Sequence, residues 1–151
     1  MLSEITGKTL TTAQQNVFNQ QWLTAVVATV SSDGFPNAAP MALFYAPDES
    51  KVRMSVGTMH ETYTNIKENG KVSICVMEEG DYAFTVKGYG KVLREKSETT
   101  GSMSIIEVDV EEVKEDTSPV AEIIQAIRLN PRSDKSQRFL EKIAQELKSI
   151  E

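Results

Sequence analysis

Residues 52–74 constrain the fold more than any other stretch, because they combine a strand, a polar turn, a short helix and a second strand. The segment reads VRMSVGTMHETYTNIKENGKVSI. Its first residues alternate between apolar and polar side chains, which is typical of a strand with one buried face. Gly57 then ends the strand, and residues 63–68 are predicted to form a helix whose first N–H groups point back at the turn. The segment therefore predicts a corner that can hold an anion such as a phosphate.

Further strands are predicted on both sides of this corner, each bounded by turn residues such as Gly, Pro, Asp and Ser. They cover residues 23–30, 37–45, 71–77, 82–94 and 103–114. With the strand before Gly57 they make six, which predicts a mainly β fold with α additions, a six-stranded Greek-key barrel with a short helix inserted. Gly88 and Gly90 interrupt the longest strand, and they indicate either the geometry of barrel closure or space for a ligand.

Helices are predicted at both ends of the chain. Near the N-terminus, Thr11 and Thr12 can cap a helix over residues 13–20. Near the C-terminus, Ser118 and Pro119 can begin a helix that Pro131 ends. This helix and a second one over residues 134–149 each carry an apolar stripe. The stripes comprise Val120, Ile123, Ile124 and Ile127 in the first helix, and Phe139, Leu140, Ile143, Leu147 and Ile150 in the second. We expect both helices to cover the barrel or a partner subunit, since a membrane-surface role would favour a basic face.

Length and charge limit the classes of function. A chain of 151 residues is expected to form one domain, with an N-terminal helical region (1–21), the barrel (22–114) and the C-terminal helices (118–150). A net charge of −6 without a block of basic residues argues against a nucleic-acid partner. No long apolar run or export signal is seen, so we expect a cytoplasmic protein without a membrane span. A single cysteine, Cys75, and a single histidine, His60, predict neither a disulfide nor a metal site.

Three segments, in this order and spacing, resemble the FMN-binding split-barrel family, which includes pyridoxamine 5′-phosphate oxidase and small bacterial FMN-binding proteins. They read TVSSDGFPNAAPMALFY, SVGTMHETYTNIKENGKVSI and FTVKGYGKV, and with the residues between them they cover about half of the chain. The small FMN-binding proteins share a V-G-x-M-H-x-T pattern, which Val56, Gly57, Met59, His60 and Thr62 match. The resemblance implies a split barrel that forms a homodimer and holds FMN in a cleft between the subunits.

The resemblance also implies which residues contact the cofactor. FMN presents a dianionic phosphate, a hydroxyl-rich ribityl chain and a flat ring, so its site needs an anion cradle, short-range donors and a slot. The implied contacts are His60, Glu61 and Thr62 at the phosphate, Met59 in the same turn, the backbone of Ser55, Val56 and Gly57 at the ring, and Ala39, Pro40, Met41 and Ala42 on the facing strand. The resemblance leaves the catalytic side chain unknown, because the flavin itself would carry the hydride or electrons and the protein would position it.

The chain departs from the family where positive charge is expected. Members commonly place Lys or Arg where this chain has Glu61 and Thr62, and the oxidase has an arginine where this chain has Ala39. A carboxylate about 5 Å from a phosphate would be repulsive by roughly 1 to 3 kcal/mol. The start of the helix, Thr62 and a protonated His60 could compensate. Longer-range cations could come from Arg53, Lys67 and Lys87.

Three functions follow from these features and remain open at this stage. The first is an FMN-binding oxidoreductase that acts on a small molecule. The second is a binding protein of the same fold for another planar ligand, such as haem or a deazaflavin. The third is a cofactor-free interaction module that keeps the barrel, since one fold can host many functions. His60, the single histidine, is correspondingly a ligand contact, a catalytic group or a simple polar turn residue.

Overall fold

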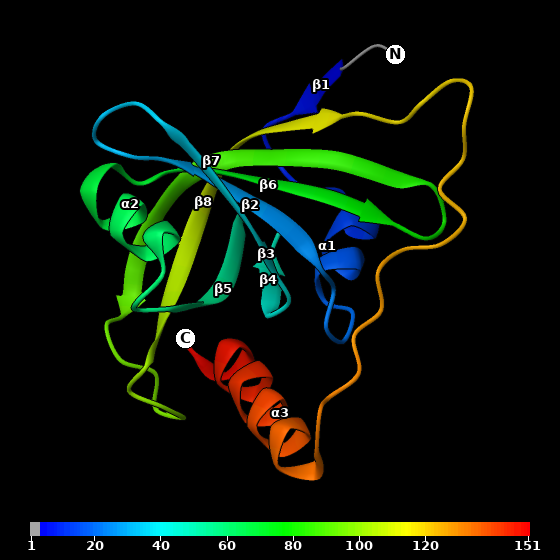
Figure 1. Ribbon diagram of the computed structural model, residues 1–151. Helices are drawn as coiled ribbons and strands as arrows, with labels where there is room; N and C mark the ends of the chain where they lie inside the picture. The colour runs from blue at the N-terminus through cyan, green and yellow to red at the C-terminus, as the bar shows by residue number, and fades with distance from the viewer. Residues whose placement is uncertain (1–3) are drawn as a thin grey trace.

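A computed structural model describes residues 4–151 of the chain (Figure 1). The first three residues of the predicted N-terminal region lie outside this range. Between residues 4 and 151 the chain forms eight strands and three helices. They are β1 (Glu4–Gly7), α1 (Thr12–Phe18), β2 (Ala25–Val30), β3 (Pro36–Met41), β4 (Phe44–Asp48), β5 (Lys51–Gly57), α2 (Glu61–Asn69), β6 (Lys71–Glu78), β7 (Tyr82–Arg94), β8 (Met103–Glu115) and α3 (Asp134–Ser149). The prediction of a mainly β fold with α additions is confirmed.

The strands form one antiparallel sheet that coils into an open barrel (Figure 1). Its order is β3-β2-β6-β7-β8-β5-β4, and β1 pairs with the end of β8. The two outermost strands in this order, β3 and β4, follow each other in the chain and are joined by Ala42 and Leu43. The two edges of the sheet therefore meet at a two-residue connection, an arrangement consistent with a split barrel.

The predicted number of six strands was too low. The predicted strand over residues 37–45 is divided into β3 and β4, because β3 pairs with β2 at one edge and β4 pairs with β5 at the other. At the division, the carbonyl of Leu43 accepts a hydrogen bond from the Ser55 N–H at 3.2 Å. The eighth strand, β1, has four residues that are mostly exposed, so its sequence carries little of the alternation that identifies a strand.

The glycines of β7 make space for close packing. The pairing of β7 with β8 shifts register between Lys87 and Gly88, and a Cβ on Gly88 would lie 2.0 Å from the Asp109 carbonyl oxygen. A Cβ on Gly90 would lie 3.1 Å from Cγ2 of Ile66 in α2. Gly88 therefore serves the geometry of the sheet, as the first alternative predicted, and Gly90 makes space for α2, which neither alternative named.

Two apolar clusters hold the helices to the sheet. In the first, Phe18 of α1 packs against Phe44 and Phe84, with ring centroids 5.8 Å apart in each pair. A capping box between Thr11 and Gln14 begins α1, near the predicted start of that helix. In the second cluster, α3 packs its buried residues onto the outside of the sheet; its members are Ile143, Leu147, Leu43 and Ile105. No helix between residues 4 and 151 has the length and apolar character that crossing a membrane requires.

The first predicted C-terminal helix was wrong. Residues 118–131, called here the connecting segment, have no regular secondary structure and run along one side of the barrel from the end of β8 to α3 (Figure 1). An extended chain advances about 3.3 Å per residue and a helix only about 1.5 Å, so an extended segment spans about twice the distance of a helix of the same length. Arg128 anchors the segment through an ion pair of 2.9 Å to the buried Glu78, and the Ile123 N–H donates to Asp81 at 3.1 Å. The second predicted helix, α3, has the expected bounds.

Candidate functional site

The residues predicted to contact the cofactor lie on three neighbouring elements. Ala39, Pro40 and Met41 belong to β3 and Ala42 follows it; Ser55, Val56 and Gly57 end β5; Met59 and His60 form the turn, and Glu61 and Thr62 begin α2. Two hydrogen bonds connect these elements. Asn37 at the start of β3 donates to Thr62 Oγ1 at 3.2 Å, and the bond from Ser55 to Leu43 ties the chain after β3 to β5. The predicted residues thus follow the rim where the two edges of the sheet meet.

The N-terminus of α2 differs from the other two helix starts. Thr11 caps α1 and Ser133 caps α3 through side-chain oxygens. His60 occupies the same position before α2, but its side chain makes no capping hydrogen bond. The turn is nevertheless held firmly, because His60 N–H donates to Gly57 O at 3.1 Å and Thr58 N–H donates to Ser102 O at 3.0 Å. The first N–H groups of α2 therefore keep their capacity to donate to an anion.

Gly57 makes space for the imidazole of His60. A Cβ on Gly57 would lie 2.6 Å from His60 Cδ2 and 3.2 Å from Nε2, so the ring lies against the glycine backbone. His60 and Glu61 are both exposed, and Met59 is 94% exposed. These side chains surround an open turn on the protein surface. They can be contacted by a ligand without any rearrangement of the core.

Thr62 points into the protein and belongs to a buried polar network that the sequence did not indicate. Only 1% of Thr62 is exposed, and its hydroxyl accepts the hydrogen bond from Asn37. Beside it, Asn65 donates to Thr29 Oγ1 at 3.0 Å. The network joins α2 to β2 and β3 and so positions the helix start. Asn37 in a predicted strand and Asn65 in a predicted helix were the available signals, since asparagine is uncommon inside either element.

The three candidate longer-range cations all have glutamate partners. The pairs are Arg53 with Glu107 (3.1 Å), Lys67 with Glu95 (3.6 Å) and Lys87 with Glu112 (3.5 Å). Arg53 is also buried, and its Nη1 donates to the carbonyl of Leu147 at 2.8 Å. Burial acts to raise the pKa of Glu107, but hydrogen bonds from Arg53 and Lys51 hold it below its usual value. The positive charges of these three side chains are therefore balanced by nearby carboxylates and are not available to an anion at the rim.

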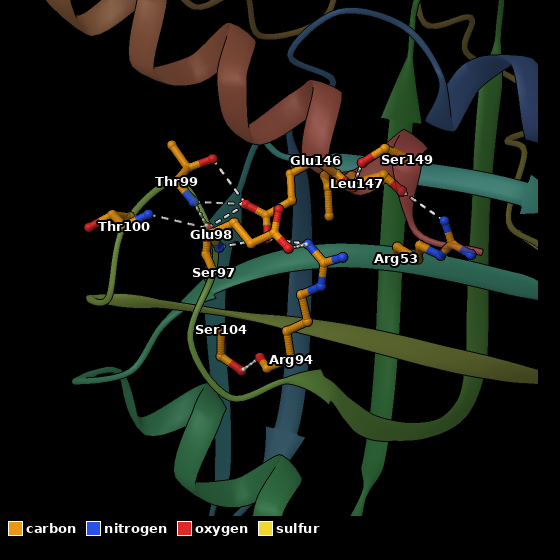
Figure 2. Close-up of polar contacts among 10 residues, drawn as sticks. All are labelled: Arg53, Arg94, Ser97, Glu98, Thr99, Thr100, Ser104, Glu146, Leu147 and Ser149. Carbon is orange, nitrogen blue, oxygen red and sulfur yellow. Dashed lines mark hydrogen bonds and ion pairs between the residues drawn. The ribbon is translucent and has the colours of Figure 1, made fainter.

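A second polar cluster fastens α3 to the loop between β7 and β8 (Figure 2). Its centre is the carboxylate of Glu146, which is 5% exposed. The carboxylate accepts five hydrogen bonds: from Ser97 Oγ at 2.6 Å, Thr99 Oγ1 at 2.9 Å, Arg94 Nη1 at 3.0 Å, and the backbone N–H groups of Glu98 at 2.9 Å and Thr99 at 3.1 Å. Burial acts to raise its pKa, but these donors outweigh burial and lower the pKa to about 2. With every oxygen engaged, Glu146 serves to hold the structure together.

The comparison with protein families identifies the chain. A model of the pyridoxamine 5′-phosphate oxidase family matches residues 11–138, which is more than half of the sequence. The chain belongs to this family. The matched part begins at the capping residue of α1 and ends inside α3, so it contains every predicted cofactor contact. Among protein sequences with curated descriptions, none matches the chain.

Solved structures of several family members and relatives share the fold. A proposed pyridoxamine 5′-phosphate oxidase from Lactobacillus delbrueckii has a TM-score of 0.64 and 24% identity, over 74% of this chain and 98% of the other. An FMN-binding protein from Syntrophomonas wolfei has a TM-score of 0.56 and 14% identity, over 76% and 85%. An F420 reductase has a TM-score of 0.56 and 20% identity, over 66% and 94%. At these identities the likeness shows the fold, and proteins with this fold include ones that are named for different cofactors.

Proposed function

We propose that this member of the family is a homodimeric FMN-binding protein that works as an oxidoreductase on a small molecule in the cytoplasm. The observation that carries the proposal is the start of α2, which lies at the rim of the barrel without a side-chain cap. Family membership supports it, and so does the structural likeness to an FMN-binding protein.

The residues at the rim offer hydrogen-bond donors that suit FMN. The N–H groups of Glu61 and Thr62 would bind the phosphate, with the imidazole of His60 beside it. The backbone of β5 at Ser55 and Val56, and that of β3, would line the flavin ring. A helix N-terminus contributes about 0.3 to 1 kcal/mol to anion binding at an exposed site. Because the nearby cations already have glutamate partners, we expect FMN binding to depend on these backbone donors and to be modest in strength.

When bound, FMN supplies the capacity to accept and return a hydride or electrons. The chain's own contribution is to orient the ring, through backbone groups that differ little with side-chain identity, and to hold the phosphate away from the exposed carboxylate of Glu61. This division of work requires no catalytic side chain on the rim. It agrees with the small residues Ala39 in β3 and Ala42 just after it, which would face the ring.

The proposal of a homodimer rests on an apolar patch along the connecting segment. Val120, Ile124 and Ile127 are 91%, 74% and 65% exposed, and Met77 of β6 is 57% exposed. Monomeric proteins rarely expose a contiguous apolar surface of this kind. Ile124, Ile127 and Met77 line one cleft together with Pro40 of β3. The patch therefore reaches a predicted flavin contact, as a cofactor cleft between subunits requires.

A variant separates the dimer from the monomer. We expect Ile124→Asp to shift the protein from dimer to monomer in sedimentation velocity, because it places a charge in the proposed interface. Ile5→Asp, which changes a similarly exposed apolar side chain on β1 (65% against 74%), serves as the control and should remain dimeric. A wild-type protein that sediments as a monomer at all concentrations would contradict the proposal.

An absorbance spectrum of the purified protein tests the cofactor first. Oxidised flavin bands, or saturable quenching of FMN fluorescence when the apoprotein is titrated, are the expected results. Anaerobic reduction of the bound flavin followed by reoxidation in air would then establish that it cycles between redox states. A colourless protein that leaves FMN fluorescence unchanged would contradict FMN binding and favour a cofactor-free interaction module.

A second candidate is a deazaflavin or another planar ligand at the same rim. One observation favours it, the shared fold with an F420 reductase. Titration with F420 beside FMN distinguishes the two flavins by affinity. An intense Soret band in the purified protein would instead indicate haem.

A further inference from the structure

A separate cleft lies between the start of α3 and the barrel, and none of residues 55–62 lines it. Its volume is about 670 Å³, within the range of about 300–1,000 Å³ that is typical of small-molecule sites. Trp22, which precedes β2, and Ala42, which follows β3, line the barrel side. The other side consists of the end of the connecting segment and the first turns of α3, which lies beneath the barrel in Figure 1. Three parts of the chain that are distant in sequence thus enclose one space.

The charged side chains that line this cleft are both positive. They are Arg132 and Lys135, and neither forms an ion pair within residues 4–151. Asp134, between them in sequence, does not line the cleft. The nearby N-terminus of α3 adds to the positive potential. In a protein with a net charge of −6, two unpaired cations around one cavity mark a site that favours an anion.

The remaining lining favours a flat apolar body. Two aromatic side chains, Trp22 and Phe139, line the cleft with Leu129 and Leu140. Trp22 has a φ of 57°, a left-handed backbone conformation that is unusual for a bulky residue and is maintained here between α1 and β2. Aromatic rings stack favourably on planar ligands.

We propose that this cleft binds a small planar organic anion. Its ring would lie against Trp22 and Phe139, and its carboxylate or phosphate would point toward Arg132 and Lys135. The phosphate cradle at α2 and the end of β5 take no part in the cleft, and Ala42 is the one predicted flavin contact that lines it.

The position of Trp22 provides a direct test, since it is the only tryptophan of the chain. The probes are 4-nitrobenzoate, a planar aromatic anion that quenches tryptophan fluorescence, and its uncharged counterpart 4-nitrobenzamide. Trp22 fluorescence of the full chain, corrected for probe absorption, is recorded during each titration without added FMN. We expect saturable quenching by the anion, with an affinity at least about fivefold above that of the amide, as one favourable charge contact of about 1 kcal/mol implies.

Two matched variants test the role of the cations. Arg132→Gln combined with Lys135→Gln should remove the preference for the anion. Arg138→Gln combined with Lys142→Gln removes the same charge from exposed positions of α3 outside the cleft and should preserve it. Three results of the titrations would overturn the proposal: quenching that never saturates, equal affinity for both probes, or a preference for the anion that survives loss of Arg132 and Lys135. A fourth is a cleft closed by a second copy of the chain, in which case the probe would quench Trp22 only after the protein is diluted to monomer.

Discussion

Replacement of Glu146 by glutamine tests how the protein holds its C-terminal helix. The carboxylate accepts five hydrogen bonds from Arg94 at the end of β7 and from the loop that follows, and its pKa falls from an ordinary value of 4.5 to about 2. A shift of that size corresponds to about 3 kcal/mol of stability at neutral pH. Glutamine retains a single acceptor oxygen and presents an NH₂ group to donors. We therefore expect Glu146→Gln to lower the free energy of unfolding by about 2 to 3 kcal/mol at pH 7.

The pH dependence follows from the direction of the shift. The folded protein releases the Glu146 proton more readily than the unfolded chain does. The contribution of the Glu146 carboxylate to the free energy of unfolding is therefore present in full above pH 4.5. It is lost progressively as the pH falls from 4.5 toward 2, where the folded state also becomes protonated. At pH 3 about 2 kcal/mol of the contribution has gone, so the difference between the wild type and Glu146→Gln should shrink by about that amount.

Urea denaturation at pH 7 and pH 3, followed by circular dichroism, measures both effects. With a slope of about 2 kcal/mol per molar urea, the midpoint at pH 7 should fall by about 1 to 1.5 M. Glu141→Gln, an exposed position of the same helix, is the control and should change the midpoint little. The reasoning is refuted by a Glu146→Gln midpoint equal to that of the wild type at pH 7, or by a difference that is the same at both pH values.

Three further perturbations address the sheet, the rim and the connecting segment. Gly88→Ala should destabilise the fold by about 1 to 3 kcal/mol in thermal denaturation, because its Cβ would meet a backbone carbonyl of β8. Gly101→Ala, which has open space around it, is the control and should be neutral in the same measurement. Glu61→Lys should tighten FMN binding roughly tenfold in fluorescence titration by supplying the missing cation, while Glu68→Lys at the far end of α2 should not. Weaker or equal binding by Glu61→Lys would mean that the phosphate lies elsewhere. Arg128→Gln leaves a buried carboxylate without its ion pair, so faster cleavage of the connecting segment in limited proteolysis is expected, and an unchanged rate would show that the ion pair does not hold it.

Local sequence patterns predicted the helices and strands whose formation depends mainly on neighbouring residues in the chain. The strand, turn and helix from β5 to α2 and the strand β6 followed from alternation and from Gly57, and β7 has the predicted bounds. The amphipathic stripe of α3 correctly identified the helix with Ile143 and Leu147 on its buried side. The same patterns placed the predicted cofactor residues on segments that the fold brings to one rim. Resemblance to the family supplied their assignment to FMN, which no pattern of spacing could have done.

The sequence by itself determined the family, the mainly β architecture and the positions of most strands and helices, because alternation, capping residues and glycines act over a few neighbouring residues. Tertiary structure decided the rest. The stripe from Val120 to Ile127 would suit a helix, but contacts with residues distant in sequence hold the segment along the barrel without regular structure. They are the hydrogen bond from Ile123 to Asp81 and the ion pair of Arg128 with Glu78. Residues 37–45 would suit one strand, but the two edges of the sheet divide them. The low pKa of Glu146 likewise depends on donors some fifty residues away, and only the folded chain brings such partners together.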